Sequence, residues 1–452
     1  MNSETKRRTL EDWPQQQLRG HKLEGSRYNS KEFFAQEWEH MWTKVWLLLG
    51  REEEMPNRGD WQREDVGPES FIMVRQEDAS IRAYYNVCQH RGARLVNEPK
   101  GHVNRFVCPY HAWAWTIEGD LNFAQDSEDF PENPCGKLTL EEVRCESFAG
   151  FVWINMDPDC VPLKEFLGPV WEDWEGYGIE KWKRYFARTT TVPFNWKVIM
   201  DNFNESYHVP TVHRATGTAA EKARFLPGID TDYKNTRFDL SDEGHNRMIM
   251  RGGHGGAGLE SDGSIGEPLA TDMRDWDLNP DEFTKRGEET REAIQEAKRR
   301  IGPERGYDHY ANMADEQLTD ALHYTLFPNF AVSVWSDGFH FLRARPHPSD
   351  PEQCIFDNWW YASQPEGETA PVRTNANVVE RDAVVEHEVY EKGELDMGVT
   401  IEQDLAIMPG QQAGFASRAY KGAYLAGQES RLSRYHELID DYIEGRRPLP
   451  KK

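Results

Sequence analysis

The chain has 452 residues, with 53 Lys and Arg against 78 Asp and Glu, which gives a formal net charge of −25. This length exceeds what one hydrophobic core usually serves, so two or three domains are expected. The acidic balance argues against nucleic acid and anionic membrane surfaces as partners, because both repel it. No stretch approaches the roughly 18 apolar residues that span a bilayer. Because the polar N-terminus also has no apolar signal segment, a soluble, cytoplasmic protein is expected.

The predicted elements differ between the two parts of the chain. Residues 1–40 are polar and predict helix, with an aromatic stripe. Short β-prone runs separated by Gly, Pro, Asn and Asp follow at 45–49, 71–74, 81–87, 105–107 and 151–154. Beyond them we expect strands at 182–192, 327–334, 339–344 and 354–362, and helices at 196–207, 280–300, 377–390 and 428–443. The sequence therefore predicts an α+β protein in which a small antiparallel β domain is inserted.

Two short Cys–His pairs stand out within the β-prone region. Cys88-Gln-His90 is followed, after seventeen residues, by Cys108-Pro-Tyr-His111. Structural zinc sites usually pair Cys with Cys and His with His, whereas each pair here holds one of each. That arrangement suits a [2Fe–2S] cluster with both thiolates on one iron and both imidazoles on the other. Such a cluster has a raised potential, which suits electron delivery to an oxygen-activating metal.

A second group of candidate residues lies at the end of the helix predicted at 196–207 and just beyond it. Glu205 and His208 are three residues apart and share a helix face, and His213 follows five residues later. Pro210 should break the helix and let His213 turn back toward His208. Two imidazoles and one carboxylate form the facial triad of non-heme iron, which leaves positions open for dioxygen and substrate. The carboxylate must come from elsewhere, and Asp404 is our choice.

These residues resemble the oxygenase (α) component of the Rieske non-heme iron oxygenases, of the aromatic-ring-hydroxylating dioxygenase type. The resemblance covers essentially the whole chain and implies an N-terminal helical segment at 1–41, an antiparallel Rieske domain at 42–157 and a helix-grip catalytic domain at 158–452. It implies that Cys88, His90, Cys108 and His111 hold the cluster, and that His208, His213 and Asp404 hold Fe(II). The segment 202–213 is similar to the iron-site motif of the family, which makes Asn202 and Glu205 candidate catalytic residues. Asp382 is the alternative carboxylate ligand.

One residue departs from the usual pattern of the family. An aspartate usually bridges the iron site to the Rieske histidine of the neighbouring subunit, and here Glu205 stands in that place. A glutamate is also found there in the quaternary-ammonium branch that includes carnitine monooxygenases. The resemblance implies electrons from NAD(P)H through a flavin reductase or ferredoxin, O2 as co-substrate, and a homotrimer (α3) or an α3β3 assembly with a small β subunit.

The substrate stays open between two classes. The resemblance favours hydroxylation of an aromatic compound, and the candidate pocket residues are Phe225, Leu226, Met248, Met250, Tyr324, Phe327, Phe330 and Trp335. The alternative is a monooxygenase or demethylase acting on a quaternary-ammonium or methylated substrate, which aromatic rings could cage. Arg343 and Arg345 share a strand face and could bind a substrate carboxylate, although a salt bridge is the commoner role. An electron carrier or a cluster protein without catalytic iron are further hypotheses, and the large second domain argues against a carrier.

Overall fold

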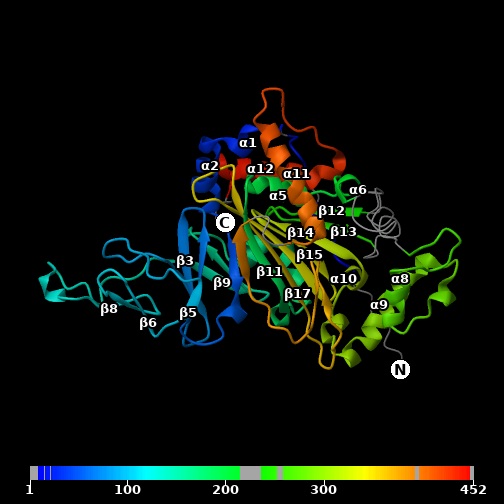
Figure 1. Cartoon of the computed structure of the whole chain (residues 1–452), viewed down its shortest axis with the longest axis horizontal. Helices are drawn as coiled ribbons and strands as arrows, with labels where there is room; N and C mark the ends of the chain where they lie inside the picture. The colour runs from blue at the N-terminus through cyan, green and yellow to red at the C-terminus, as the bar shows by residue number, and fades with distance from the viewer. Residues whose placement is uncertain are drawn as a thin grey trace. The chain divides into compact units, whose positions relative to one another are not determined.

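A computed structural model describes residues 9–14, 16–20, 22–213, 236–251, 258–391 and 396–447. The chain divides into two compact units. The smaller unit contains residues 35–166, 346–350 and 441–452, and the larger contains 1–34, 167–345 and 351–440. Figure 1 shows the course of the chain through both. In the described residues, no helix is long and apolar enough to cross a membrane.

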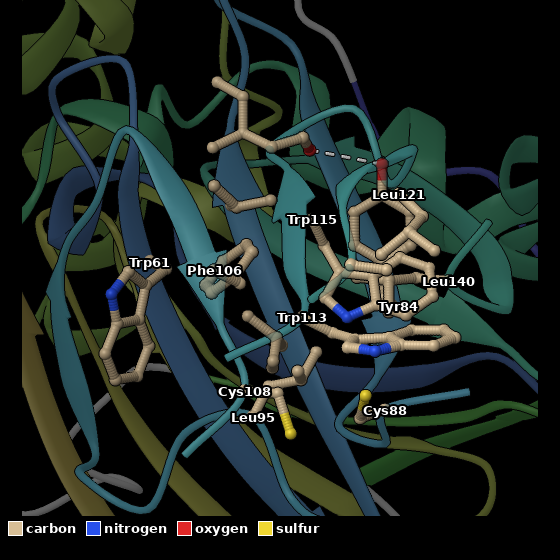
Figure 2. Packing of buried hydrophobic residues seen from close by; sticks show 14 residues of the cluster. Trp61, Tyr84, Cys88, Leu95, Phe106, Cys108, Trp113, Trp115, Leu121 and Leu140 are labelled. Atoms are coloured by element: carbon tan, nitrogen blue, oxygen red, sulfur yellow. Dashed lines mark hydrogen bonds between the residues drawn. The ribbon is translucent and has the colours of Figure 1, made fainter. Parts of the chain in front are cut away.

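The smaller unit is built from antiparallel strands. Its seven-stranded sheet has the order β1-β10-β9-β4-β3-β2-β5, and β6, β7 and β8 form a separate three-stranded sheet. The strands are β1 (Leu47–Arg51), β2 (Asp60–Val66), β3 (Glu69–Arg75), β4 (Ile81–Tyr85), β5 (Lys100–His102), β6 (Arg105–Val107), β7 (Ala114–Thr116), β8 (Leu121–Phe123), β9 (Glu142–Phe148) and β10 (Phe151–Asn155). Trp61, Phe106, Trp113 and Trp115 pack in one buried cluster with two cysteines (Figure 2).

The larger unit is organised around an eight-stranded sheet of order β12-β13-β14-β15-β16-β17-β11-β20. The run from β12 to β16 and the pair β11–β17 are antiparallel, whereas β20 runs parallel to β11. The strands are β11 (Lys183–Val192), β12 (Thr236–Leu240), β13 (Asn246–Met250), β14 (Ala321–Leu326), β15 (Phe330–Trp335), β16 (Gly338–Pro346), β17 (Cys354–Ala362) and β20 (Glu388–Glu391). The short strands β18 (Val372–Arg373) and β19 (Val378–Val379) pair separately.

Four helices of the larger unit lie close together. Figure 1 shows α1, α5, α11 and α12 together, and His436 of α12 bonds to Asp201 of α5. The α-helices described in the two units are α1 (Ser26–Asn29), α2 (Lys31–Glu37), α3 (Leu163–Leu167), α4 (Pro169–Glu175), α5 (Trp196–Phe203), α6 (Val209–Val212), α8 (Leu269–Asp275), α9 (Thr290–Ile301), α10 (Asp315–Thr319), α11 (Val399–Phe415) and α12 (Ser430–Ile443). This arrangement brings α5 and α11 close together.

Three predicted helices differ from the structure, and one is confirmed. The helix predicted at 377–390 is wrong, because this valine-rich segment forms β19 and β20 instead, as β-branched residues favour. The helix predicted at 280–300 begins only at Thr290, after two 3₁₀ turns. The helix predicted at 196–207 ends at Phe203. The C-terminal helix is confirmed as α12.

Candidate active site

The two Cys–His pairs lie on loops that have the same backbone geometry. Cys88 follows β4, its N–H donates to Ala93 O at 2.8 Å, and its carbonyl accepts from Gly92 N at 3.0 Å. The loop after β6 repeats this pattern, with Cys108 bonded to Trp113 O at 2.8 Å and accepting from Ala112 N at 3.0 Å. Gly92 and Ala112 occupy the same loop position, and both have positive φ, of 73° and 56°. Two equivalent loops therefore present the two pairs.

The side chains of these loops separate into an inner and an outer set. Cys88 and Cys108 are 1% and 3% exposed, and Figure 2 shows both sulfurs at the same end of the buried cluster. The His90 and His111 rings are partly exposed and lie 4.6 Å apart between centroids. His90 stacks on the buried Trp113 ring at 4.4 Å, which orients its imidazole.

The protonation of these groups fits a metal cluster. Burial, and then the neighbouring Cys108, raise the pKa of the Cys88 thiol, so two adjacent thiolates need a cation to compensate them. Burial lowers the pKa of His90, which keeps it neutral. Its buried Nδ1 has no hydrogen-bond partner in the described part of the chain. Two buried thiols beside two imidazoles are the donor set that a Rieske cluster requires.

The second group of side chains comes from α5, α6 and α11. His208 is the N-cap of α6 and His213 is its C-cap, so the chain restarts a helix between them, and Pro210 stands in the first turn of α6 rather than breaking α5. Asp404 lies on α11 and is 2% exposed. In the described residues, His208, His213 and Asp404 form the one group of three or more potential ligands that can share an ion, with ligand atoms within 4.8 Å of one another.

Hydrogen bonds orient both imidazoles toward Asp404. His208 Nδ1 lies 2.6 Å from Glu205 Oε1, and His213 Nδ1 lies 2.8 Å from Gln403 Oε1. Because both partners are acceptors, each Nδ1 donates a proton to its partner and each Nε2 is turned toward Asp404. The Nε2 atoms of His208 and His213 lie 3.5 and 3.4 Å from Asp404 Oδ1. Two imidazole nitrogens and a carboxylate oxygen thus converge as non-heme iron requires.

The electrostatics of this group also fit a bound cation. Burial raises the pKa of Asp404, although both histidines act in the opposite direction. Burial alone would lower the pKa of His208, but the hydrogen bond and charge of Glu205 outweigh it and raise the pKa. The Asn202 amide lowers the pKa of Asp404, although its Nδ2 forms no hydrogen bond within the described residues. A divalent ion would balance this buried carboxylate.

Glu205 is held close to His208 by the backbone that follows α5. Its Oε2 accepts from the N–H groups of Tyr207 and His208, the latter at 3.1 Å, while its Oε1 faces His208 Nδ1. The helix before it is fixed by Asp201, which accepts from the Tyr28 hydroxyl at 2.6 Å and lies 2.8 Å from His436 Nε2. Glu205 therefore orients His208 from a rigid support.

Several sequence-based candidates lie elsewhere. Asp382 is exposed and does not belong to the group around Asp404. Arg343 and Arg345 both bind the buried Asp357, with Nε–Oδ2 distances of 2.7 and 3.0 Å, so they form a structural ion network.

Some of the predicted pocket residues lie in the core, and others lie outside the described residues. Tyr324 and Phe330 pack against Trp174 in the core, and Phe327 packs against Tyr435. Phe225 and Leu226 lie outside the described residues. Gln403 was not predicted, and its place directly before Asp404 is the only signal that the sequence offers.

Two family models match the chain. The Rieske [2Fe-2S] domain matches residues 45–133, and the ring hydroxylating alpha subunit (catalytic domain) matches residues 179–445. The chain belongs to the ring-hydroxylating α-subunit family. This α subunit thus combines a Rieske [2Fe–2S] domain with the catalytic domain that binds mononuclear iron, and the expected family and fold class are confirmed.

Curated relatives include both substrate classes. The α subunit is 34% identical over 203 residues to the carnitine monooxygenase oxygenase subunit of Escherichia coli (strain K12), covering 44% of this chain and 54% of the relative. It is 28% identical over 249 residues to biphenyl dioxygenase subunit alpha of Paraburkholderia xenovorans (strain LB400), covering 50% and 51%. The chain thus spans about half the length of the curated relatives it matches.

Solved structures share the fold over nearly the whole chain. A quaternary ammonium Rieske monooxygenase in complex with L-carnitine matches with a TM-score of 0.62 and 20% identity, covering 93% of this chain and 95% of that one. Naphthalene 1,2-dioxygenase with indole in its active site matches with a TM-score of 0.63 and 20% identity, covering 94% and 93%. Likeness at this identity shows the fold of the α subunit alone.

Proposed function

We propose that this α subunit is the terminal oxygenase of a Rieske system, which uses O2 and electrons from NAD(P)H to hydroxylate a small organic substrate. The convergence of His208, His213 and Asp404 within 4.8 Å carries the proposal, because it forms a facial triad with open positions. Cys88, His90, Cys108 and His111 would hold the cluster. When bound, the iron activates dioxygen and the cluster supplies electrons.

The protein side chains then have separate tasks. Glu205 and Gln403 hold the Nδ1 protons and so fix which nitrogen of each imidazole faces the iron position. Asn202 supports the buried Asp404 carboxylate. We further propose that Glu205 connects His208 to the cluster of a neighbouring subunit in an α3 or α3β3 assembly. The partners would be a flavin reductase, alone or with a ferredoxin.

Quaternary-ammonium compounds are the substrate class that we place first. Glu205 at the bridging position, together with carnitine monooxygenases at 34% identity, supports this class. Aromatic compounds are the second candidate, because biphenyl dioxygenase and a salicylate 5-hydroxylase are also relatives. Oxygen uptake with carnitine, glycine betaine, salicylate and biphenyl, in the presence of a reductase, distinguishes the two classes.

Metal analysis of anaerobically purified protein tests the proposal first. About three irons and about two acid-labile sulfides per chain, with a Rieske-type EPR signal after dithionite, are expected. About two irons that do not rise on reconstitution with Fe(II) would contradict the oxygenase and indicate an electron carrier.

A further inference from the structure

One face of the eight-stranded sheet carries a line of polar groups. This line connects the end of α5 to the start of α11, and these two helices flank the proposed iron site. β14, β15 and β16 contribute residues directly opposite one another, and β17 continues the line. We call this set the polar row: His323, Ser333, His340 and Asn358. His323 Nε2 lies 2.8 Å from the carbonyl of Phe203 at the end of α5. Asn358 donates to the carbonyl of Met397, directly before α11, at 2.6 Å. The polar row therefore faces the side of the sheet where α5 ends and α11 begins.

The hydrogen bonds of His323 determine where its proton lies. A carbonyl only accepts, so Nε2 carries the hydrogen that Phe203 O receives. Burial holds the pKa of His323 well below its ordinary value, so the ring is neutral and Nδ1 is an acceptor. The hydroxyl of Ser333, 2.9 Å away, therefore donates its proton to Nδ1. Ser333 Oγ keeps only its lone pairs for another group.

The hydrogen bonds of His340 determine the position of its proton in the same way, starting from Asn358 at the other end of the polar row. Because Asn358 donates Nδ2 to Met397 O, its Oδ1 is the atom 2.7 Å from His340 Nε2, which must donate. Burial lowers the pKa of His340 to about 4, so this ring is also neutral. Its Nδ1 is then an acceptor, and it forms no hydrogen bond within the described part of the chain.

The two acceptors adjoin side chains that are partly exposed. Ser333 and His340 are directly opposite in an antiparallel pair, which places their Cβ atoms about 4.5–5.5 Å apart. Ser333 is partly exposed although β15 is an interior strand. Trp335 and Trp360, which alternation places on the same face, are also partly exposed and stack at 5.2 Å. Two aromatic rings thus stand beside two acceptors that receive no hydrogen bond from the described residues.

We propose that Ser333 Oγ and His340 Nδ1 form a subsite that accepts a hydrogen bond from a hydroxyl group of the substrate. The row contains no carboxylate to balance an ammonium group and offers no free donor to a substrate carboxylate, so a neutral hydroxyl fits best. The inference rests on the proposed function, because it places the substrate between the polar row and the metal-binding group.

Equilibrium binding to the anaerobic full-length protein, measured by calorimetry, tests this subsite without turnover. Two ligand pairs differ by one hydroxyl: L-carnitine against γ-butyrobetaine, and 3-hydroxybenzoate against benzoate. In at least one pair, we expect the hydroxylated member to bind about tenfold more tightly. Ser333→Ala should reduce this preference, Ser333→Thr should retain it, and Ser349→Ala, at an exposed hairpin position, should leave it unchanged.

The wild-type comparison decides the matter even if Ser333→Ala does not fold. Equal dissociation constants within both pairs, or no binding of any of the four compounds, would overturn the subsite. A preserved preference without oxygen uptake would count against the proposed function alone.

Discussion

The two proposed metal-binding regions of this α subunit differ in how they are assembled. The proposed cluster residues lie between residues 88 and 111, on two equivalent loops of one small β unit. The proposed iron site instead joins His213 to the segment of Gln403 and Asp404, and the hydrogen bond between His213 and Gln403 spans 190 residues. A cluster motif is therefore nearly complete in the local sequence, whereas the iron site exists only when α11 packs against α5.

The largest expected effect is loss of the cluster while the iron site survives. Cys88→Ser replaces a thiolate with a hydroxyl, which is a poor ligand for cluster iron. We expect about one iron per chain, no acid-labile sulfide and no Rieske EPR signal. Cys135→Ser, at a partly exposed cysteine, is the matched control and should keep about three irons. Loss of all iron in Cys88→Ser would show that the two regions depend on each other.

Asp404→Ala should have the reciprocal effect. Without its carboxylate, the mononuclear site loses one of three ligands, so the iron content should fall to about two per chain with an unchanged Rieske signal. Asp382→Ala removes an exposed carboxylate and should retain all iron. The reverse pattern, with iron lost only in Asp382→Ala, would refute the assignment of Asp404.

Glu205→Gln sharpens the comparison, because it alters neither set of ligands. The amide keeps the length of the side chain but removes the charge that faces His208 Nδ1. Both metals should remain, while substrate-dependent oxygen uptake should fall by about 100-fold. Unchanged uptake would remove the proposed role in electron transfer between the centres.

Gln403→Leu should produce the smallest effect. The substitution removes the acceptor of the His213 Nδ1 proton, so the imidazole loses its fixed orientation. We expect about a tenfold weaker affinity for Fe(II), measured by titration of the iron-depleted protein. Gln411→Leu changes an exposed glutamine on the same helix and serves as the control. Equal affinities in the two variants would show that Gln403 does not position His213.

The sequence by itself determined the family, the fold class and the four cluster residues as candidates, because short-range spacing carries that information. It also brought out His208 and His213, which are five residues apart. It did not reveal Gln403, the polar row or the ion network of Asp357, since those contacts join strands and helices far apart in the chain. The predicted helix at 377–390 failed for a related reason, because pairing of β20 with β11 overrides local helical pattern.

Only the tertiary structure decided between Asp404 and Asp382 as the carboxylate of the group. The sequence favoured Asp404 and kept Asp382 as the alternative, because it does not give the distance of either carboxylate from the imidazoles. Packing of α11 buries Asp404 beside two imidazoles, whereas Asp382 stays in an exposed turn. Burial and distance, which create the chemistry of the site, are properties of the folded chain rather than of the motif.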